Sequence, residues 1–346
     1  MRALVKTRPG PGMELMDVPD PVAGPGEVVI RVEAAGVCGS DIARYVWTRN
    51  HEPGAAKDMS KDLPRILGHE YAGVVVEVGT GVSPSRMGER IAVQNVLGCS
   101  ACRECDAGLP NLCRVRKTLG VHRDGGYAQF ASLPEANLTP IPDDMDFHVA
   151  ASVTPFAVSS NAVSLAELEP GHGIVIWGLG PIGIAVALAA RLRGAEVILG
   201  IDRNPIRLAE AEELGIPTLD TSVGDPAALL LDRLGPRAAD AVFEAAGLAD
   251  AIRWSLPILR KCRPIVLIGN LRDHVQADLM PLVMDQQRLV GSRSYSLPIW
   301  RMALQTVTRT PFPQTLGEMV TFDEAIAAFE AAAAGTGRPF TILPNA

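Results

Sequence analysis

The chain has 346 residues, of which 47% are hydrophobic and 21% charged, which suits about two globular domains and excludes a disordered or fibrous protein. Its 32 Lys and Arg against 39 Asp and Glu give a net charge of −7, which argues against a nucleic-acid partner or an anionic membrane surface. No apolar run is long enough for a signal peptide or a membrane span, so we expect a cytoplasmic protein whose six cysteines stay reduced.

Up to residue 150 the chain is rich in Gly, Pro and short β-branched runs, and strands are predicted at 28–32 and 71–78. From residue 171 strands and helices alternate. Strands are predicted at 174–177, 196–201, 239–243 and 264–268, and helices at 181–193, 204–214 and 248–259. This alternation predicts a parallel sheet with helices on both faces. A last strand at 339–343 could rejoin the first unit, which would make the parallel sheet an insertion.

A glycine-rich turn follows the strand at 174–177 and opens the next helix. Its glycines provide a tight turn, a close approach for a pyrophosphate and close helix packing, with the helix N-terminus facing the phosphates. Asp202 lies 24 residues after Gly178, where a carboxylate binds a ribose diol and repels a 2′-phosphate, so NAD is expected over NADP. Arg203 could soften that preference, and a glycine turn in another α/β domain is the alternative. The candidate cofactor residues in the turn are Gly178, Leu179, Gly180, Pro181, Ile182 and Gly183.

Four cysteines fall within fifteen positions, at Cys99, Cys102, Cys105 and Cys113. Short Cys-x2-Cys spacings let thiolates from one turn reach a single Zn²⁺, and four thiolates leave no open position. We therefore predict a structural zinc. An iron–sulfur cluster is the main competitor, and unmetallated thiols are the weaker one. Cys262 stands apart and is predicted to be an ordinary core or edge cysteine.

A third group joins Cys38-Gly39-Ser40-Asp41 with Gly68-His69-Glu70. A thiolate, an imidazole and a carboxylate suit a catalytic zinc that keeps a position open for water or substrate. Spacing alone cannot pair Cys38 with His69, because a lone Cys and a lone His are more often unrelated core residues.

In their order along the chain, these motifs resemble the zinc-dependent medium-chain alcohol dehydrogenases. The resemblance covers essentially the whole chain and includes the segments 244–247, 268–270 and 291–295. Tyr45-x-Trp47 and the segment 154–156 are similar to the polyol and threonine dehydrogenase branch. The family implies an α/β protein with a GroES-like β-rich catalytic domain (1–156, with a zinc lobe at 95–116). A Rossmann-type doubly wound sheet would be inserted at 157–291, and 292–346 would return to the catalytic domain. It also implies a homodimer or homotetramer.

The resemblance implies roles for individual residues. Zinc would bind the alcohol, Ser40 would pass on its proton, Asp41 would orient His69, and Ile268 would line the cofactor site. Two positions depart from the family pattern. Thr154 replaces an acidic zinc ligand, so Glu70 becomes the third ligand beside Cys38 and His69, with water as the fourth, or the site holds no stable zinc. Ala43 replaces a relay histidine, for which His51 and His122 are candidate substitutes, although each alone is more often a surface histidine.

The loop at 44–65 carries five basic and three acidic residues, so it could receive an anionic substrate or be a solvated surface loop. The leading function is NAD-dependent oxidation of a secondary alcohol on a small polar substrate: a polyol, a cyclitol or a hydroxy-amino acid. The alternatives are a zinc-independent NAD(P)H reductase and an NAD-binding homologue that has lost its catalytic zinc. The basic residues of the loop are Arg44, Arg49, Lys57, Lys61 and Arg65, and the acidic ones are Glu52, Asp58 and Asp62.

Overall fold

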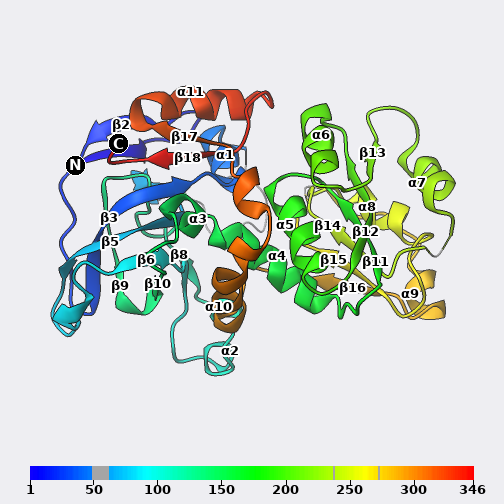
Figure 1. Ribbon diagram of the computed structural model, residues 1–346, viewed down its shortest axis with the longest axis horizontal. Helices are drawn as coiled ribbons and strands as arrows, with labels where there is room; N and C mark the ends of the chain where they lie inside the picture. The colour runs from blue at the N-terminus through cyan, green and yellow to red at the C-terminus, as the bar shows by residue number, and fades with distance from the viewer. Residues whose placement is uncertain (49–61, 237, 272) are drawn as a thin grey trace. The chain divides into compact units, whose positions relative to one another are not determined.

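The computed structural model describes residues 1–48, 62–236, 238–271 and 273–346, and its contacts divide the chain into two compact units (Figure 1). Unit 1 comprises Met1–Thr154 and Pro313–Ala346, and unit 2 comprises Pro155–Phe312. Residues 292–312 therefore group with unit 2, although we expected them to return to the first domain. The helix α10 (Leu297–Thr306) lies in this stretch, and its Trp300 stacks on Tyr295 within unit 2.

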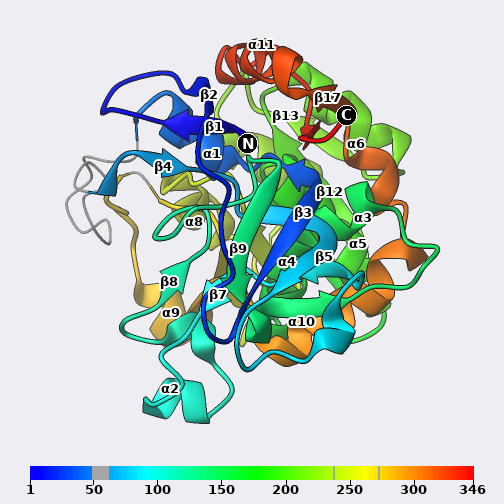
Figure 2. The same ribbon diagram turned by 90° about the vertical axis from the view of Figure 1, so that its left-hand side faces the viewer.

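Unit 1 is built mainly from antiparallel strands, and Figure 2 shows three of them, β3, β5 and β9, side by side. One sheet has the order β2-β1-β4, a second has the order β10-β6-β5-β3-β18-β17 with β9 paired to β3, and a third joins β7 to β8. The strands are β1 (Arg2–Lys6), β2 (Glu14–Asp17), β3 (Glu27–Gly36), β4 (Arg65–Ile66), β5 (Glu70–Val78), β6 (Arg90–Val93), β7 (Val96–Leu97), β8 (Lys117–Thr118), β9 (Phe130–Pro134), β10 (Leu138–Pro140), β17 (Glu318–Thr321) and β18 (Phe340–Leu343).

The C-terminal strand β18 pairs with β3 of the N-terminal part, with Thr341 opposite Gly36, so the predicted strand near the C-terminus forms and rejoins the first unit. The core beneath these strands is aliphatic and aromatic. It includes Ile30 on β3, Tyr71 on β5 and Phe329 on α11. The helices and 3₁₀ turns of unit 1 are α1 (Gly39–Tyr45), η2 (Pro84–Arg86), α2 (Arg103–Asp106), η3 (Pro110–Leu112), η4 (Glu135–Asn137), α3 (Phe147–Ala151) and α11 (Phe322–Ala333), while α4 (Val153–Leu165) and η6 (Phe312–Thr315) span the unit boundaries.

Unit 2 has a six-stranded sheet in the order β13-β12-β11-β14-β15-β16, and every pair in it is parallel. The sheet therefore has the predicted doubly wound arrangement, in which the strand order reverses beside β11. The strands are β11 (Gly173–Trp177), β12 (Glu196–Asp202), β13 (Thr218–Asp220), β14 (Ala241–Glu244), β15 (Pro264–Leu267) and β16 (Arg288–Gly291). The remaining helices are α5 (Pro181–Arg191), α6 (Pro205–Glu213), α7 (Pro226–Leu234), α8 (Asp250–Ser255), α9 (Met280–Met284) and the 3₁₀ turn η5 (Val307–Arg309).

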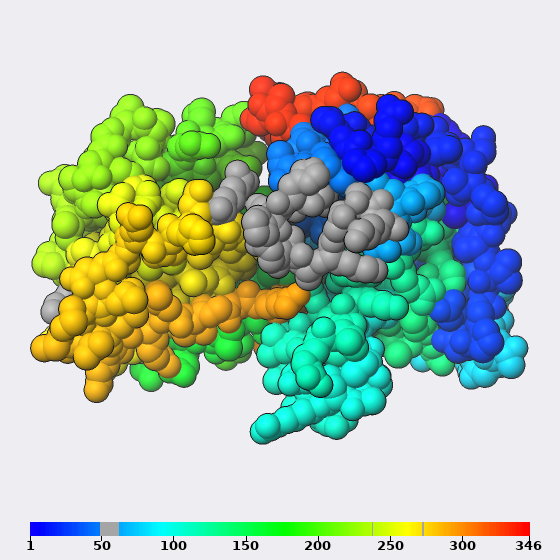
Figure 3. Space-filling view, turned by 180° about the vertical axis from the view of Figure 1, so that it is seen from behind, coloured from blue at the N-terminus to red at the C-terminus, as the bar shows by residue number. Residues whose placement is uncertain are grey.

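The lobe that carries α2 projects from the rest of unit 1, and it is the cyan segment at the bottom of Figure 3. No helix among the described residues is long and apolar enough to cross a membrane.

Candidate functional site

The first cluster lies in unit 1, where two segments of the chain meet. Cys38 directly precedes helix α1, and Glu70 opens β5 opposite Gly36 of β3. His69 comes just before Glu70. One ligand atom from each of these three side chains lies within 4.8 Å of the other two. The structure thus brings together the thiol, imidazole and carboxyl that spacing alone could not pair.

The turn before His69 depends on a glycine. Gly68 has φ +90, and a Cβ there would lie 2.4 Å from the Tyr127 ring. Only a residue without a side chain fits, because the left-handed backbone and the aromatic ring together exclude a Cβ. Tyr127 is itself fully buried, and its hydroxyl donates to the Gly36 carbonyl at 3.2 Å and to Asp41 Oδ2 at 3.0 Å.

Asp41 connects this cluster to α1. Its carboxylate is fully buried, and its two oxygens lie 3.3 Å and 3.2 Å from His69 Nδ1. It also accepts the Cys38 N–H at 3.3 Å, and an Arg44 guanidinium nitrogen lies 3.5 Å away. A carboxylate at Nδ1 holds the proton there and leaves Nε2 of His69 as the free donor atom for a metal.

Burial and charge shift the pKa values of the cluster. Burial raises the pKa of Glu70 to about 7. Burial opposes the charged form of His69, yet the neighbouring Asp41 carboxylate raises its pKa well above the ordinary value. Asp41 is also buried, but the attraction of His69 and its hydrogen bonds keep its pKa below the ordinary value. A cation held among these donors would offset the charge of the buried carboxylates, so the donor set fits zinc.

Thr154 and Ala43, the two positions that depart from the family pattern, both lie among described residues. Thr154 is almost fully buried, and its hydroxyl has no hydrogen-bond partner among the described residues. Ala43 lies on α1 and carries no titratable group, while its neighbour Arg44 bonds to Ser40. His122 accepts the Thr118 N–H through Nδ1, within the turn after β8.

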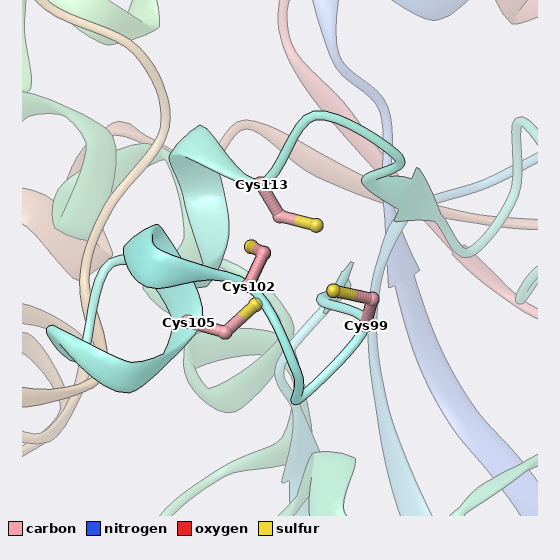
Figure 4. A group of neighbouring side chains, drawn as sticks. All are labelled: Cys99, Cys102, Cys105 and Cys113. Carbon is pink, nitrogen blue, oxygen red and sulfur yellow. The ribbon is translucent and has the colours of Figure 1, made fainter.

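The second cluster is the four-cysteine lobe shown in Figure 4, in which the sulfur atoms point toward one another. Cys99 follows β7. Cys102 caps the N-terminus of α2, Cys105 lies within that helix, and Cys113 caps the C-terminus of η3. The four sulfur atoms lie within 4.8 Å of one another, which suits a zinc tetrahedron with Zn–S bonds of about 2.3 Å. Desolvation opposes the Cys113 thiolate, but backbone and side-chain hydrogen bonds, with Cys99 first among them, lower its pKa to about 7.

Gly98 makes the lobe possible, because a Cβ at this position would lie 2.8 Å from the Cys105 sulfur. Cys262 lies outside both clusters. Its side chain is exposed on a residue with φ +61, so of the two predicted placements, core or edge, the core placement is wrong.

The third group lies in unit 2 at the carboxyl end of β11. Gly178 has φ +87, and a Cβ there would lie 2.9 Å from the Ala246 nitrogen. A Cβ on Gly183 would lie 1.8 Å from the Gly178 carbonyl oxygen. These two glycines therefore allow the turn and the close approach of α5 to it. Gly180 caps α5 and Pro181 is its first residue, so the helix N-terminus opens at the turn, which fits a dinucleotide phosphate.

Asp202 ends β12 beside this turn. It accepts the N–H groups of Leu179 at 2.8 Å, Arg203 at 2.7 Å and Asn204 at 3.0 Å. The guanidinium of Arg207 lies 3.7 Å from the Asp202 carboxylate, whereas Arg203 contributes its backbone N–H. Sequence reasoning missed Arg207, although a basic residue in the first turn of the helix after β12 is a usable signal.

Ile182 follows Pro181 in α5. Ile268 follows β15, and its N–H bonds to the Glu244 carbonyl at 2.9 Å, at the carboxyl ends of β14 and β15.

Part of the basic loop lies outside the described residues, namely Arg49, His51, Glu52, Lys57, Asp58 and Lys61. In the part that the structure describes, Arg65 pairs with Asp124 at 3.1 Å and Arg44 bonds to Ser40. Neither of these arginines is a freely solvated charge.

Comparison with known proteins gives matches along most of the chain. The family described as the alcohol dehydrogenase GroES-like domain matches residues 24–143, and the family described as zinc-binding dehydrogenase matches residues 181–309. An L-threonine 3-dehydrogenase from Sinorhizobium medicae is 34% identical over 292 residues, which cover 84% of this chain and 83% of the relative. A sorbitol dehydrogenase from Halalkalibacterium halodurans is 33% identical over 309 residues, which cover 88% and 87%.

Among solved structures, a zinc-binding dehydrogenase from Sinorhizobium meliloti bound to NADP is similar to this chain, with a TM-score of 0.87 and 28% identity. The match covers 99% of each chain.

Proposed function

We propose that this chain, which belongs to the zinc-dependent medium-chain alcohol dehydrogenase family, oxidises a secondary alcohol of a small polar substrate to a ketone with zinc and NAD. The substrate classes are a polyol, a cyclitol and a hydroxy-amino acid. The observation that carries the proposal is the convergence of Cys38, His69 and Glu70, with Nδ1 of His69 held by Asp41.

In this proposal Cys38, His69 and Glu70 hold the catalytic zinc, and Thr154 does not. The carboxylate of Glu70 is a better donor than a neutral hydroxyl, and it lies 3.7 Å from His69 Nε2, the ring nitrogen that Asp41 leaves free. Asp41 fixes the orientation of the His69 ring. The cysteines of the lobe hold the structural zinc, and the glycine turn and Asp202 hold the cofactor.

When bound, zinc supplies Lewis-acid polarisation of the substrate hydroxyl, and NAD supplies a hydride acceptor. The protein supplies the proton path. Ser40 lies two residues after Cys38, in the first turn of α1, and is half-buried. Its hydroxyl accepts the proton of the substrate alcohol and releases its own proton toward solvent.

The remaining expectations stay part of the proposal. They are a homodimer or homotetramer and a cytoplasmic location that suits six cysteines outside disulfides. Light scattering of the purified protein tests the assembly.

A screen of secondary alcohols and their ketones, followed by NADH absorbance, tests the function. The wild type is expected to reduce NAD with at least one polyol, cyclitol or hydroxy-amino acid. Ser40→Ala should slow the reaction by about a hundredfold, which is typical for the loss of a general base. Ser132→Ala is the matched control, since the Ser132 hydroxyl bonds to Glu27 on a distant strand of the same unit. No turnover with any alcohol by a zinc-loaded wild type would refute the proposal.

A further inference from the structure

Arg44 makes three polar contacts on helix α1 that the family pattern did not lead us to expect. Its Nη1 lies 3.0 Å from both the main-chain oxygen and the hydroxyl oxygen of Ser40, one helical turn earlier. The same nitrogen lies 3.5 Å from Asp41 Oδ1. The side chain is 17% exposed, so the guanidinium lies mostly inside the protein against the residue proposed to carry the proton.

The chemistry of a guanidinium decides what this contact can do. Arginine donates hydrogen bonds, has no acceptor atom and does not lose its proton in proteins. Ser40 Oγ must therefore accept from Arg44 with one lone pair, and the hydroxyl hydrogen must point elsewhere. The second lone pair stays available to accept the proton of an alcohol.

The residue before Arg44, Ala43, also limits where the Ser40 proton can go. Ala43 stands where relatives carry a relay histidine, and its methyl side chain cannot accept a proton. With Ala43 and Arg44 beside Ser40, neither of these side chains takes a proton onward along α1. The hydrogen of Ser40 must leave on the side of the hydroxyl that faces away from Arg44.

We propose that Arg44 is the positioning residue of Ser40: it fixes the hydroxyl as a proton acceptor toward the substrate alcohol and directs the serine's own proton away from α1. The inference rests on the proposed function, because it assigns a partner to the proton path of that reaction. It also accounts for activity without a relay histidine.

A secondary alcohol loses its hydroxyl proton and the hydrogen of its C–H bond in this reaction. The substrate O–H bond breaks and its proton bonds to Ser40 Oγ, while the Ser40 O–H bond breaks and its proton passes to a water or a hydroxyl on the far side. NAD, when bound, would accept the C–H electron pair as hydride. The guanidinium transfers no proton, and its charge stabilises Ser40 Oγ as its proton departs.

A double-mutant cycle tests this assignment. Arg44→Leu should lower kcat about tenfold to a hundredfold with little change in KM, and should move the half-maximal rate to higher pH. In a Ser40→Ala background the same change should add almost nothing, because Arg44 acts through Ser40. Arg44→Lys should recover part of the loss, since an ammonium also donates and carries the charge.

Arg86→Leu is the matched control, because Arg86 is a partly buried arginine of the same unit that pairs with Glu89 and Glu135. It should leave kcat and the pH profile unchanged. Thermal unfolding and zinc content of every variant show whether Arg44→Leu has disturbed the fold or the metal through Asp41. If Arg44→Leu proves too unstable to assay, Arg44→Lys takes its place in the cycle, and its loss of kcat relative to wild type should then vanish in the Ser40→Ala background.

A second readout needs no turnover. The alcohol 2,2,2-trifluoroethanol is acidic and resists oxidation, so its binding to the protein–NAD complex can be followed by proton release. Wild type should bind it and release a proton at a lower pH than Arg44→Leu does. Equal proton release in both proteins, or independent additive effects of Arg44→Leu and Ser40→Ala on kcat, would overturn the inference while leaving the proposed function intact. A wild type that neither oxidises alcohols nor binds trifluoroethanol would overturn both.

Discussion

The charge of Asp202 predicts the choice between NAD and NADP. A 2′-phosphate carries a charge of about −1.5 to −2. At about 6 Å from a carboxylate, with an effective dielectric constant of about 40, it would be repelled by about 2–3 kcal/mol. The Arg207 guanidinium, 3.7 Å from the carboxylate, offsets part of this repulsion. We therefore expect NAD to bind about 10- to 100-fold more tightly than NADP, which corresponds to about 1.4–2.8 kcal/mol.

Asp202→Asn removes the charge and keeps an oxygen that can accept a main-chain N–H. It should bring the two dissociation constants, measured by titration calorimetry, to within about threefold. Arg207→Leu should have the opposite effect and widen the preference for NAD. Asp225→Asn is the control, because Asp225 also caps main-chain N–H groups in unit 2 but lies at the start of α7. The reasoning fails if wild type binds NADP more tightly, or if Asp202→Asn leaves the ratio unchanged.

Three further predictions concern unit 1. Cys102→Ser should lose a zinc and lower the melting temperature, while Cys262→Ser, at an exposed thiol, should change neither, and an unaltered zinc content in Cys102→Ser would disprove the structural site. Tyr127→Phe removes the donor to a buried carboxylate and should lower the free energy of unfolding by about 1.5–3 kcal/mol in urea titrations, and a change below that range would show the bond to be unimportant. The hydrogen bond from Arg123 lowers the pKa of Glu27, so the stability it adds is present above the ordinary carboxyl pKa and lost as pH falls through the lowered one. Melting of Glu27→Gln should accordingly differ from wild type at pH 7 and converge with it in acid, and a difference that persists in acid would contradict this.

The elements that local sequence could predict are those whose cause is local. The glycine turn follows β11 as predicted, because its spacing needs no distant partner. The parallel sheet and the C-terminal strand also follow from local patterns. The predicted helix at 248–259 is shorter, since α8 ends at Ser255, two residues before Pro257. A proline in a helix interior removes a hydrogen bond and clashes with the preceding turn.

The contacts that sequence could not supply join distant residues. Tyr127 meets Asp41 across 86 positions, and no spacing rule connects an aromatic residue to a carboxylate at that distance. Pairing Cys38 with His69 needed the resemblance to a family, and the sheet that places Gly36 opposite Glu70 gives the physical reason. The family resemblance implies a return to the first unit at residue 292, whereas residues 292–312 group with unit 2, because local sequence does not say against which body α10 packs.

The zinc content of the purified chain tests the account most directly. The measurement is elemental analysis of wild type, Cys38→Ser and Cys102→Ser after removal of loosely bound metal. The account predicts two zinc ions per wild-type chain, one of which is lost in each variant, because Cys38 and Cys102 belong to separate clusters. A wild type that holds a single zinc, retained in Cys38→Ser, would contradict the catalytic site and with it the proposed reaction.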